Sequence, residues 1–183
     1  MAIKTSLLLD RAAAQLALRP DSTLAVIADA AGVSRTTLFY RFSTREGLLE
    51  ALALDTLERA SEALQAISWH HDDIEGTIRD VACALVPLAP RMQVVLRESP
   101  AHSTSGVNAR WTEALHPLIH YLDTLQSEQR IRASTPMTWL VTSLVYLLFA
   151  AWDAVGSATL TPEQAASLTA ETWLRGCSPQ DSC

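Results

Sequence analysis

The chain has 183 residues, of which 49% are hydrophobic, and a formal net charge of −6. This composition excludes a disordered chain, and the length suits one domain or two small ones. The negative charge excludes a general polyanion binder, and three widely spaced cysteines exclude a disulfide framework or a zinc pattern.

Neither the longest apolar stretch nor the N-terminal segment suggests a membrane protein. The longest apolar stretch, residues 139–152, is too short to span a bilayer and contains Thr142 and Ser143. The N-terminal segment lacks a basic leader and a cleavage site, because Asp10 and Arg11 interrupt it. We therefore expect a cytoplasmic protein with no membrane partner.

Helical periodicity runs through the whole chain, and no segment alternates like a β-strand. It predicts an all-α fold with an N-terminal three-helix helix-turn-helix head and a C-terminal helical domain. The expected helices cover about 4–18, 23–31, 34–42, 43–67, 74–86, 91–97 and 109–129, followed by two within about 136–175. The polar segment 98–108 is expected to be a mobile loop.

Residues 23–42 have the pattern of two short helices around a tight turn. Ser22 or Thr23 can cap the first helix, and its apolar positions (Leu24, Ile27, Ala28 and Ala31) form a single stripe. Gly32 supplies the freedom for the turn. In the second helix, one side is expected to be core and the other free. The core side carries Leu38, Phe39 and Phe42, and the free side carries Thr36, Thr37, Tyr40 and Arg41.

The next helix is expected to begin with a capping box formed by Ser43 and Glu46. Further along, Thr135-Pro136 predicts a helix with proline at its first position. Thr161-Pro162-Glu163-Gln164 predicts another start, with the glutamine completing a capping box.

The charge distribution favours the free side of the second short helix as a DNA contact. Residues 1–50 contain six Lys or Arg and five Asp or Glu, so the negative excess lies in the rest of the chain. Between Ser34 and Arg45 there are three arginines and no acid. A helix with these side chains can enter a major groove. The alternative is an ordinary solvated helix with surface charges.

Each polar residue of this segment has an expected role. Arg35, Thr36 and Thr37 are candidates for base reading, because arginine can grip guanine and a threonine methyl can meet a thymine methyl. Thr23, at the start of its helix, suits a phosphate. Tyr40 and Arg41 are suited to either contact.

These residues resemble the DNA-binding segment of the TetR family of bacterial transcriptional regulators. The resemblance covers about the first quarter of the chain: TLAVIADAAGVS at 23–34, TLF at 37–39, Phe42, and TREGLL at 44–49. It implies a homodimer with two DNA-reading heads and a ligand pocket in each regulatory domain, whose ligand lowers the affinity for DNA. It also implies a phosphate contact for Arg45, at the family's lysine position. The chain departs from the family with Phe39 for tyrosine and Arg41 for histidine.

The predicted domains are a helix-turn-helix DNA-binding domain over 1–46 and a ligand-binding and dimerisation domain over 47–183. Because the 139–152 stretch is apolar almost all round, it needs cover on more than one side. A second copy of the last two helices, about 136–175, would complete a four-helix interface.

Aromatic and polar side chains in the second domain suggest a ligand pocket. The candidates are Met92, Trp111, His120, Trp139, Tyr146 and Phe149. The alternative is that each is ordinary core. His116 and His120 have the spacing of a metal pair but lack a third ligand, so we expect no metal and no other cofactor. Cys83 is expected to be a small buried apolar residue.

The sequence therefore predicts a bacterial DNA-binding transcriptional regulator of the repressor type. It would bind a palindromic double-stranded DNA operator as a homodimer and be released by a small-molecule effector. One alternative is a regulator without a functional pocket, and another is a helical enzyme or interaction module. The chain has no catalytic triad spacing, P-loop or paired carboxylates, so an enzyme is not expected.

Overall fold

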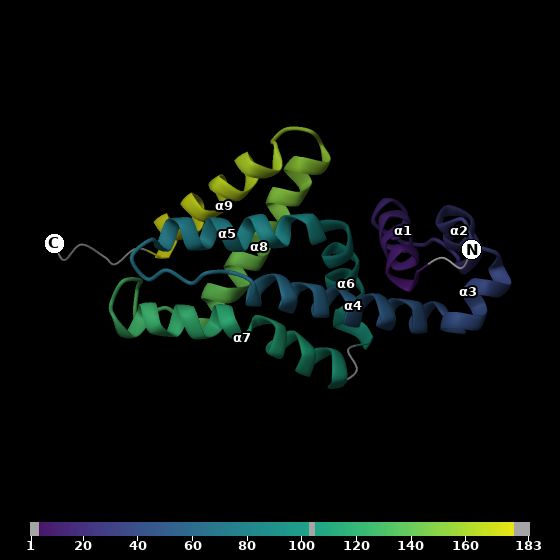
Figure 1. Cartoon of the computed structure of the whole chain (residues 1–183), viewed down its shortest axis with the longest axis horizontal. Coiled ribbons are helices and arrows are strands. Elements are labelled where there is room, and N and C mark those ends of the chain that lie inside the picture. Colours follow the sequence, from purple (N-terminus) through teal and green to yellow (C-terminus); the bar gives the residue numbers. More distant parts are fainter. Residues whose placement is uncertain (1–3, 103–104, 178–183) are drawn as a thin grey trace. The chain divides into compact units, whose positions relative to one another are not determined.

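The computed structural model describes residues 4–102 and 105–177, and the regular structure within these ranges is helical with no β-strand. This confirms the all-α prediction. Figure 1 shows the elements in chain order. They are α1 Thr5–Leu18, α2 Leu24–Ala31, α3 Arg35–Phe42, α4 Arg45–Gln65, α5 Ile74–Leu85, the 3₁₀ turn η1 Val86–Leu88, α6 Ala89–His102, α7 Ser105–Ser127, α8 Met137–Gly156 and α9 Pro162–Cys177.

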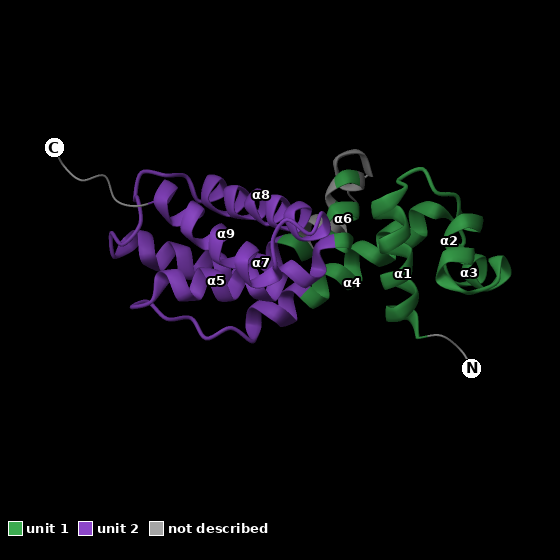
Figure 2. Ribbon diagram, turned by 90° about the horizontal axis from the view of Figure 1, so that it is seen from above, with its two compact units in different colours: residues 1–59, 90–111 green, residues 60–89, 112–183 purple. Residues whose placement is uncertain are grey.

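The chain forms two compact units, coloured separately in Figure 2. Unit 1 comprises residues 1–59 and 90–111, and unit 2 comprises residues 60–89 and 112–183. Helix α4 runs without a break past residues 46 and 47, and most of it belongs with the head. The compact units thus differ from the division at 46, which remains a prediction about function.

Unit 1 is built around one apolar core that the first three helices share. Leu8, Leu9 and Leu16 of α1 pack with Ile27 of α2 and Leu38 of α3. Leu48 and Leu52 of α4 and Val94 of α6 close the same cluster. Because α2 and α3 are only eight residues each, packing on this core rather than intrinsic propensity holds them helical.

The turn between α2 and α3 has the predicted geometry. Gly32 lies in the left-handed region at φ 70°, and its N–H donates to the Asp29 carbonyl at 3.1 Å. Ser34 then caps α3, accepting from the Thr37 N–H at 3.1 Å. A side chain at position 32 would be strained in this conformation, so glycine fits the sharp turn.

Several predictions about local structure are wrong. Residues 98–102 and 105–108 are helical and not a loop, because α6 continues to His102 and α7 begins at Ser105; 103 and 104 lie outside the described residues. The α4 cap is Thr44, which accepts from the Gly47 N–H at 3.0 Å, because Ser43 lies at φ 58°. Pro136 precedes α8 as its cap instead of occupying its first turn. Cys83 is exposed.

Unit 2 has α9 packed against both α5 and α8. Trp173 of α9 is buried, and its indole N–H donates to the Leu140 carbonyl of α8 at 3.0 Å. The predicted capping box at the start of α9 is confirmed. The Thr161 N–H donates to the Gln164 side chain at 2.9 Å, and the Gln164 N–H donates to the Thr161 hydroxyl at 3.2 Å.

Helix α8 buries one face and exposes another. The buried face includes Leu144, Leu148 and Trp152, while Trp139 and Tyr146 are each 68% exposed. Among the described residues α8 is long and apolar enough to cross a membrane by length and composition, and 33% of its apolar window is buried. It is longer than the 139–152 stretch because Met137, Thr138 and residues 153–156 extend it.

Candidate nucleic-acid interface

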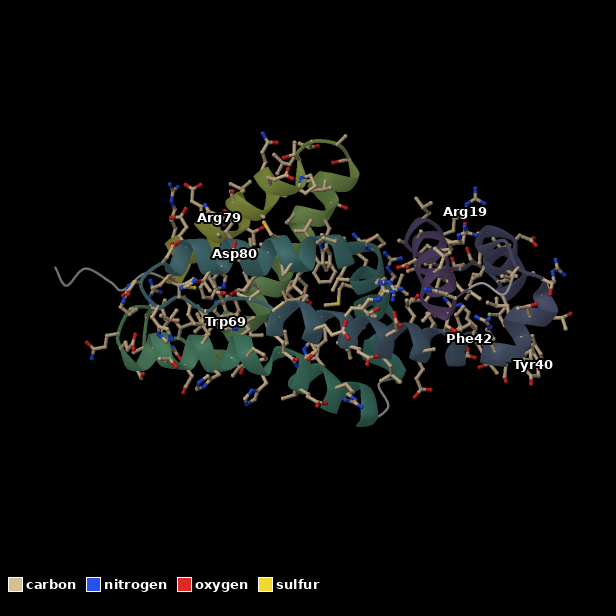
Figure 3. All side chains as sticks on the ribbon, viewed as in Figure 1. Arg19, Tyr40, Phe42, Trp69, Arg79 and Asp80 are labelled. Carbon is tan, nitrogen blue, oxygen red and sulfur yellow. The ribbon has the colours of Figure 1, made fainter. Side chains whose placement is uncertain are left out.

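The free side of α3 is exposed to solvent. On the opposite side of α3, Leu38 is the one fully buried side chain of residues 35–42, and Phe42 is partly buried against the head core. Arg35, Thr36 and Thr37 are exposed. Tyr40 is 89% exposed and points away from the head in Figure 3, where Phe42 is also labelled. The residues chosen for base contact therefore share an accessible surface.

The first turn of α3 is capped by Ser34. The Ser34 hydroxyl accepts from the Thr37 N–H and lies 2.8 Å from the Thr37 hydroxyl. A base contact through the Thr37 hydroxyl would share this hydrogen bond. Arg35 and Thr36 lie beside it on the same turn. The cap thus fixes the start of the helix at the point where a recognition helix meets base edges.

Thr23 lies where the prediction needs it, at the N-cap of α2. Its side chain is exposed and accepts from the Val26 N–H at 3.5 Å. This long bond leaves the oxygen weakly engaged. The N–H groups of Leu24 and Ala25 have no partner within the helix, since the first turn of any helix lacks one. An anion can approach both the hydroxyl and these groups.

Arg41 and Arg45 are half-buried and hold elements of the head together. The Arg41 guanidinium donates to the Thr5 hydroxyl of α1 at 3.3 Å. The Arg45 guanidinium donates to the Pro20 carbonyl, in the connection between α1 and α2, at 2.8 Å. These bonds orient both cations, and a phosphate would share them. No pattern in the sequence indicated these two hydrogen bonds.

The prediction that Phe39 belongs to the head core is wrong, because its side chain is 63% exposed. Each position along an α-helix turns by about 100°, so Phe39 lies a quarter-turn beyond Leu38 and at the edge of the buried stripe. Phe39 joins Arg35 and Thr36 on the accessible surface.

The six candidate ligand residues are divided between the two units. Met92 and Trp111 belong to unit 1, the first buried and the second half-buried. His120, Trp139, Tyr146 and Phe149 belong to unit 2, where His120, Trp139 and Tyr146 are exposed. Tyr146 and Phe149 are in contact, with ring centroids 5.8 Å apart. The ligand role of these residues stays a prediction.

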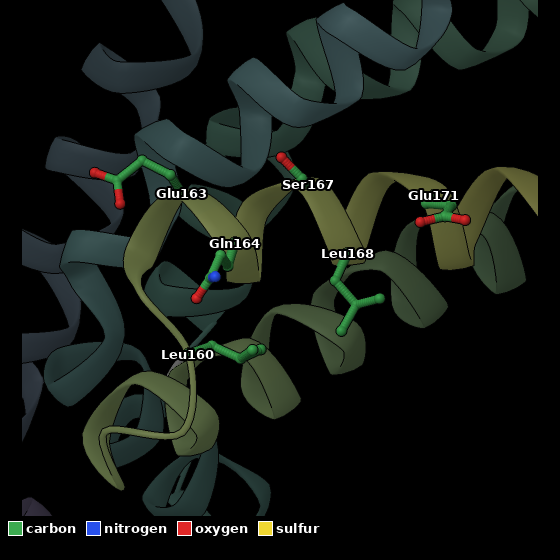
Figure 4. A pocket seen from close by; sticks show the side chains of 6 residues that line it. All are labelled: Leu160, Glu163, Gln164, Ser167, Leu168 and Glu171. Carbon is green, nitrogen blue, oxygen red and sulfur yellow. The ribbon is translucent and has the colours of Figure 1, made fainter.

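A surface hollow in unit 2 lies along α9 (Figure 4) and is lined by none of those six. Apart from Leu160, its lining residues are all exposed, so the hollow is open to solvent. They are Leu160, Glu163, Gln164, Ser167, Leu168 and Glu171. Within residues 4–102 and 105–177, no group of three His, Cys, Asp or Glu side chains is placed to hold a metal ion.

Residues 8–52 match the family described as bacterial regulatory proteins, tetR family. The fold resembles the TetR-like transcriptional regulator LfrR from Mycobacterium smegmatis in complex with proflavine. That match has a TM-score of 0.78 and 24% identity, and covers 93% of this chain and 94% of that one. No functionally curated protein matches the sequence.

Two other solved structures have the same arrangement. A TetR family transcription regulator from Marinobacter aquaeolei VT8 has a TM-score of 0.71 and 14% identity, with coverage of 96% and 95%. The fatty acid degradation regulator FadR from Bacillus halodurans has a TM-score of 0.65 and 16% identity, with coverage of 94% and 99%. At these identities the likeness is one of fold. The chain thus has the N-terminal segment and the fold of TetR-family transcriptional regulators.

Proposed function

We propose that this chain, with its tetR-family N-terminal segment, is a cytoplasmic DNA-binding repressor that binds a palindromic operator as a homodimer. The observation that carries the proposal is the outward surface of α3. Arg35, Thr36, Thr37 and Tyr40 are exposed there beside a glycine turn and a capped first turn. Residues 34–45 contain three arginines and no acid, so this surface favours the phosphate backbone.

The exposed face of α8 and α9 supports the homodimer. Trp139 and Tyr146 stand seven positions apart on α8, which puts them on one side of the helix, and Leu168 of α9 is 51% exposed. An apolar face of this kind marks an interaction site. A second copy presenting the same helices would cover it symmetrically and give a four-helix interface.

The direct test is selection of bound duplexes from a random pool with the purified full chain. A palindromic site should emerge, with half-sites separated by about one helical turn, roughly 34–36 Å, or a multiple of it. A chain that retains no duplex at low ionic strength would contradict the proposal, provided that circular dichroism shows it folded and helical.

The selected duplex then separates phosphate contacts from base contacts. Arg45→Ala should weaken binding to all sequences alike and reduce the salt dependence, since it removes one cation near the backbone. Thr37→Ala should change which sequences are preferred. Selection with both variants and titration at several salt concentrations measure this. Equal effects on sequence preference would contradict the division.

Arg45 also donates to the Pro20 carbonyl, so its loss can loosen the head. Arg45→Lys is the matched variant: it keeps the charge and gives up the fork geometry of the guanidinium. Retained affinity and salt slope in Arg45→Lys would assign the effect to charge. A loss equal to that of Arg45→Ala would assign it to the Pro20 bond and contradict the phosphate role.

We also propose a small-molecule effector that releases the operator. LfrR was solved with proflavine, which makes this planar cation a suitable probe. Tryptophan fluorescence of the protein without DNA should change on titration, which avoids intercalation of the dye in the duplex. Operator release by the same concentration of dye is the second expected result.

The alternative is a regulator with no working pocket. It is favoured by the exposure of three of the six candidate ligand residues, His120, Trp139 and Tyr146. A panel of planar cations and fatty acids that leaves both the fluorescence and the operator binding unchanged would support it. DNA binding itself would then remain, so this result would contradict the proposed effector without contradicting the proposed DNA binding.

A further inference from the structure

Phe39 is a large apolar side chain in an unusual place. It is 63% exposed on α3, whereas the neighbouring Leu38 is 1% exposed. Covering a phenylalanine removes a large apolar surface from water, and most of that surface stays exposed on the head. Single exposed apolar residues are common, so exposure alone means little. What distinguishes Phe39 is that its surface is the one that carries the base-reading candidates.

The helical register places Phe39 beside those candidates. Residues three and four positions apart are neighbours on a helix, so Phe39 follows Thr36 and Arg35 on the same side, one turn further along. All three are exposed. A helix that brings Arg35 and Thr36 to base edges therefore also brings the Phe39 ring to the groove.

The chemistry of the ring limits what it can recognise there. Phenylalanine has no hydrogen-bonding group, so it cannot bind a phosphate oxygen or a polar base edge. In the major groove the apolar feature is the 5-methyl group of thymine, and phenylalanine is a side chain that contacts it. The thymine 5-methyl group is therefore the feature of the major groove that suits the Phe39 ring.

We propose that Phe39 is a specificity-determining residue whose ring packs against a thymine methyl in each half-site of the operator. This rests on the proposed DNA binding of α3. Contact with the methyl removes apolar surface of both groups from water. The head would then prefer thymine over cytosine at one base pair of each half-site.

The test is a double-mutant cycle that combines substitution of Phe39 with removal of the thymine methyl group. In the duplex selected from the random pool, each thymine is replaced in turn by uracil, which lacks only the methyl. Wild-type protein should lose about fourfold in affinity for each copy of one particular thymine, the size expected for one methyl group. In Phe39→Ala that loss should vanish, and in Phe39→Leu it should partly remain.

Two controls complete the design. Leu18→Ala removes an apolar side chain that is 81% exposed in the same unit but lies on α1, and it should keep the wild-type response to uracil. Thymines read by Thr36 or Thr37 should remain sensitive in Phe39→Ala, which shows that the variant still docks in register. Because Phe39 is exposed, its variants should keep the wild-type melting temperature.

The outcomes are distinct. If Phe39→Ala responds to every uracil substitution as the wild type does, the inference is overturned while DNA binding stands. If the wild type responds to no uracil substitution, the ring contacts no methyl group and the inference is also overturned. If no duplex binds wild-type protein at all, it is the proposed function that fails.

Discussion

Tyr121 shows how single side chains in unit 2 combine a polar group with burial. It is 2% exposed, and its hydroxyl donates to the His70 carbonyl at 2.9 Å. Its ring lies 5.1 Å from that of Trp69 and 5.4 Å from that of His71. Burial raises the pKa of the phenol above its ordinary value of 10.0. The hydroxyl thus ties α7 to the segment between α4 and α5.

Tyr121→Phe tests this bond. It should lower the free energy of unfolding by about 1 kcal/mol near neutral pH, the usual value of one hydrogen bond. Since the phenol loses its proton more readily in the unfolded chain, its contribution is complete below pH 10 and declines as the pH rises toward the higher folded-state pKa. Urea unfolding at about pH 8 and about pH 10.5 should show a smaller difference at the higher pH.

The matched control is Tyr40→Phe, because Tyr40 is 89% exposed and belongs to the other unit. It should leave stability unchanged at both values of pH. A difference between wild type and Tyr121→Phe that stays constant as the pH rises would contradict the assigned pH dependence.

At the scale of elements, one buried cation joins three helices of unit 1. Arg91 of α6 is 3% exposed. Its guanidinium donates to the Asp10 carboxylate of α1 at 2.8 Å, to the Asp55 carboxylate of α4, and to the Ser6 carbonyl at 3.1 Å. Arg59 also lies beside Asp55, at 3.0 Å. The head is therefore held to α6 by charge as well as by the apolar contact of Val94.

Arg91→Met should destabilise the protein by about 2 kcal/mol, below the 3–5 kcal/mol of a fully buried pair because the Asp10 side chain is 45% exposed and can be solvated. Arg59→Met is the matched control. Its cation is one-third exposed, so its loss should cost under about 1 kcal/mol. Urea unfolding followed by circular dichroism measures both. Equal costs would mean that burial of Arg91 adds nothing.

The contrast between these elements explains what could be read from the sequence. The α2 stripe, the Gly32 turn and the Thr161–Gln164 box were predicted because neighbours within a few positions determine them. The Arg91 network was not, since Asp10 lies 81 positions away. Residues 98–108 have a loop-like composition, yet 98–102 and 105–108 are helical. Phe39 was misplaced because the edge of a stripe is decided by the partners that pack on it.

At the scale of the whole molecule, α8 has an apolar face that the single chain leaves exposed to solvent. Trp139 and Tyr146 are exposed on a helix that otherwise packs Leu144 and Leu148 inward. Tyr146 also contacts Phe149, which in turn lies 4.9 Å from Trp152, so the aromatic rings continue from surface to core. Large aromatic side chains of this kind are the residues that dominate interface energies.

Tyr146→Lys should therefore weaken the proposed dimer. Loss of a buried interface aromatic costs about 2 kcal/mol or more of binding free energy, and the lysine also places a charge in an apolar contact. The dissociation constant of the dimer should therefore rise at least ~30-fold. Sedimentation velocity over a range of protein concentrations measures this. The same variant should bind a full palindromic operator more weakly, while its affinity for an isolated half-site stays close to that of the wild-type head. Leu18→Lys, exposed on unit 1, should change neither. If Tyr146→Lys kept the wild-type dissociation constant, the second copy would have to bind another surface, because a lysine buried in this interface would weaken the dimer.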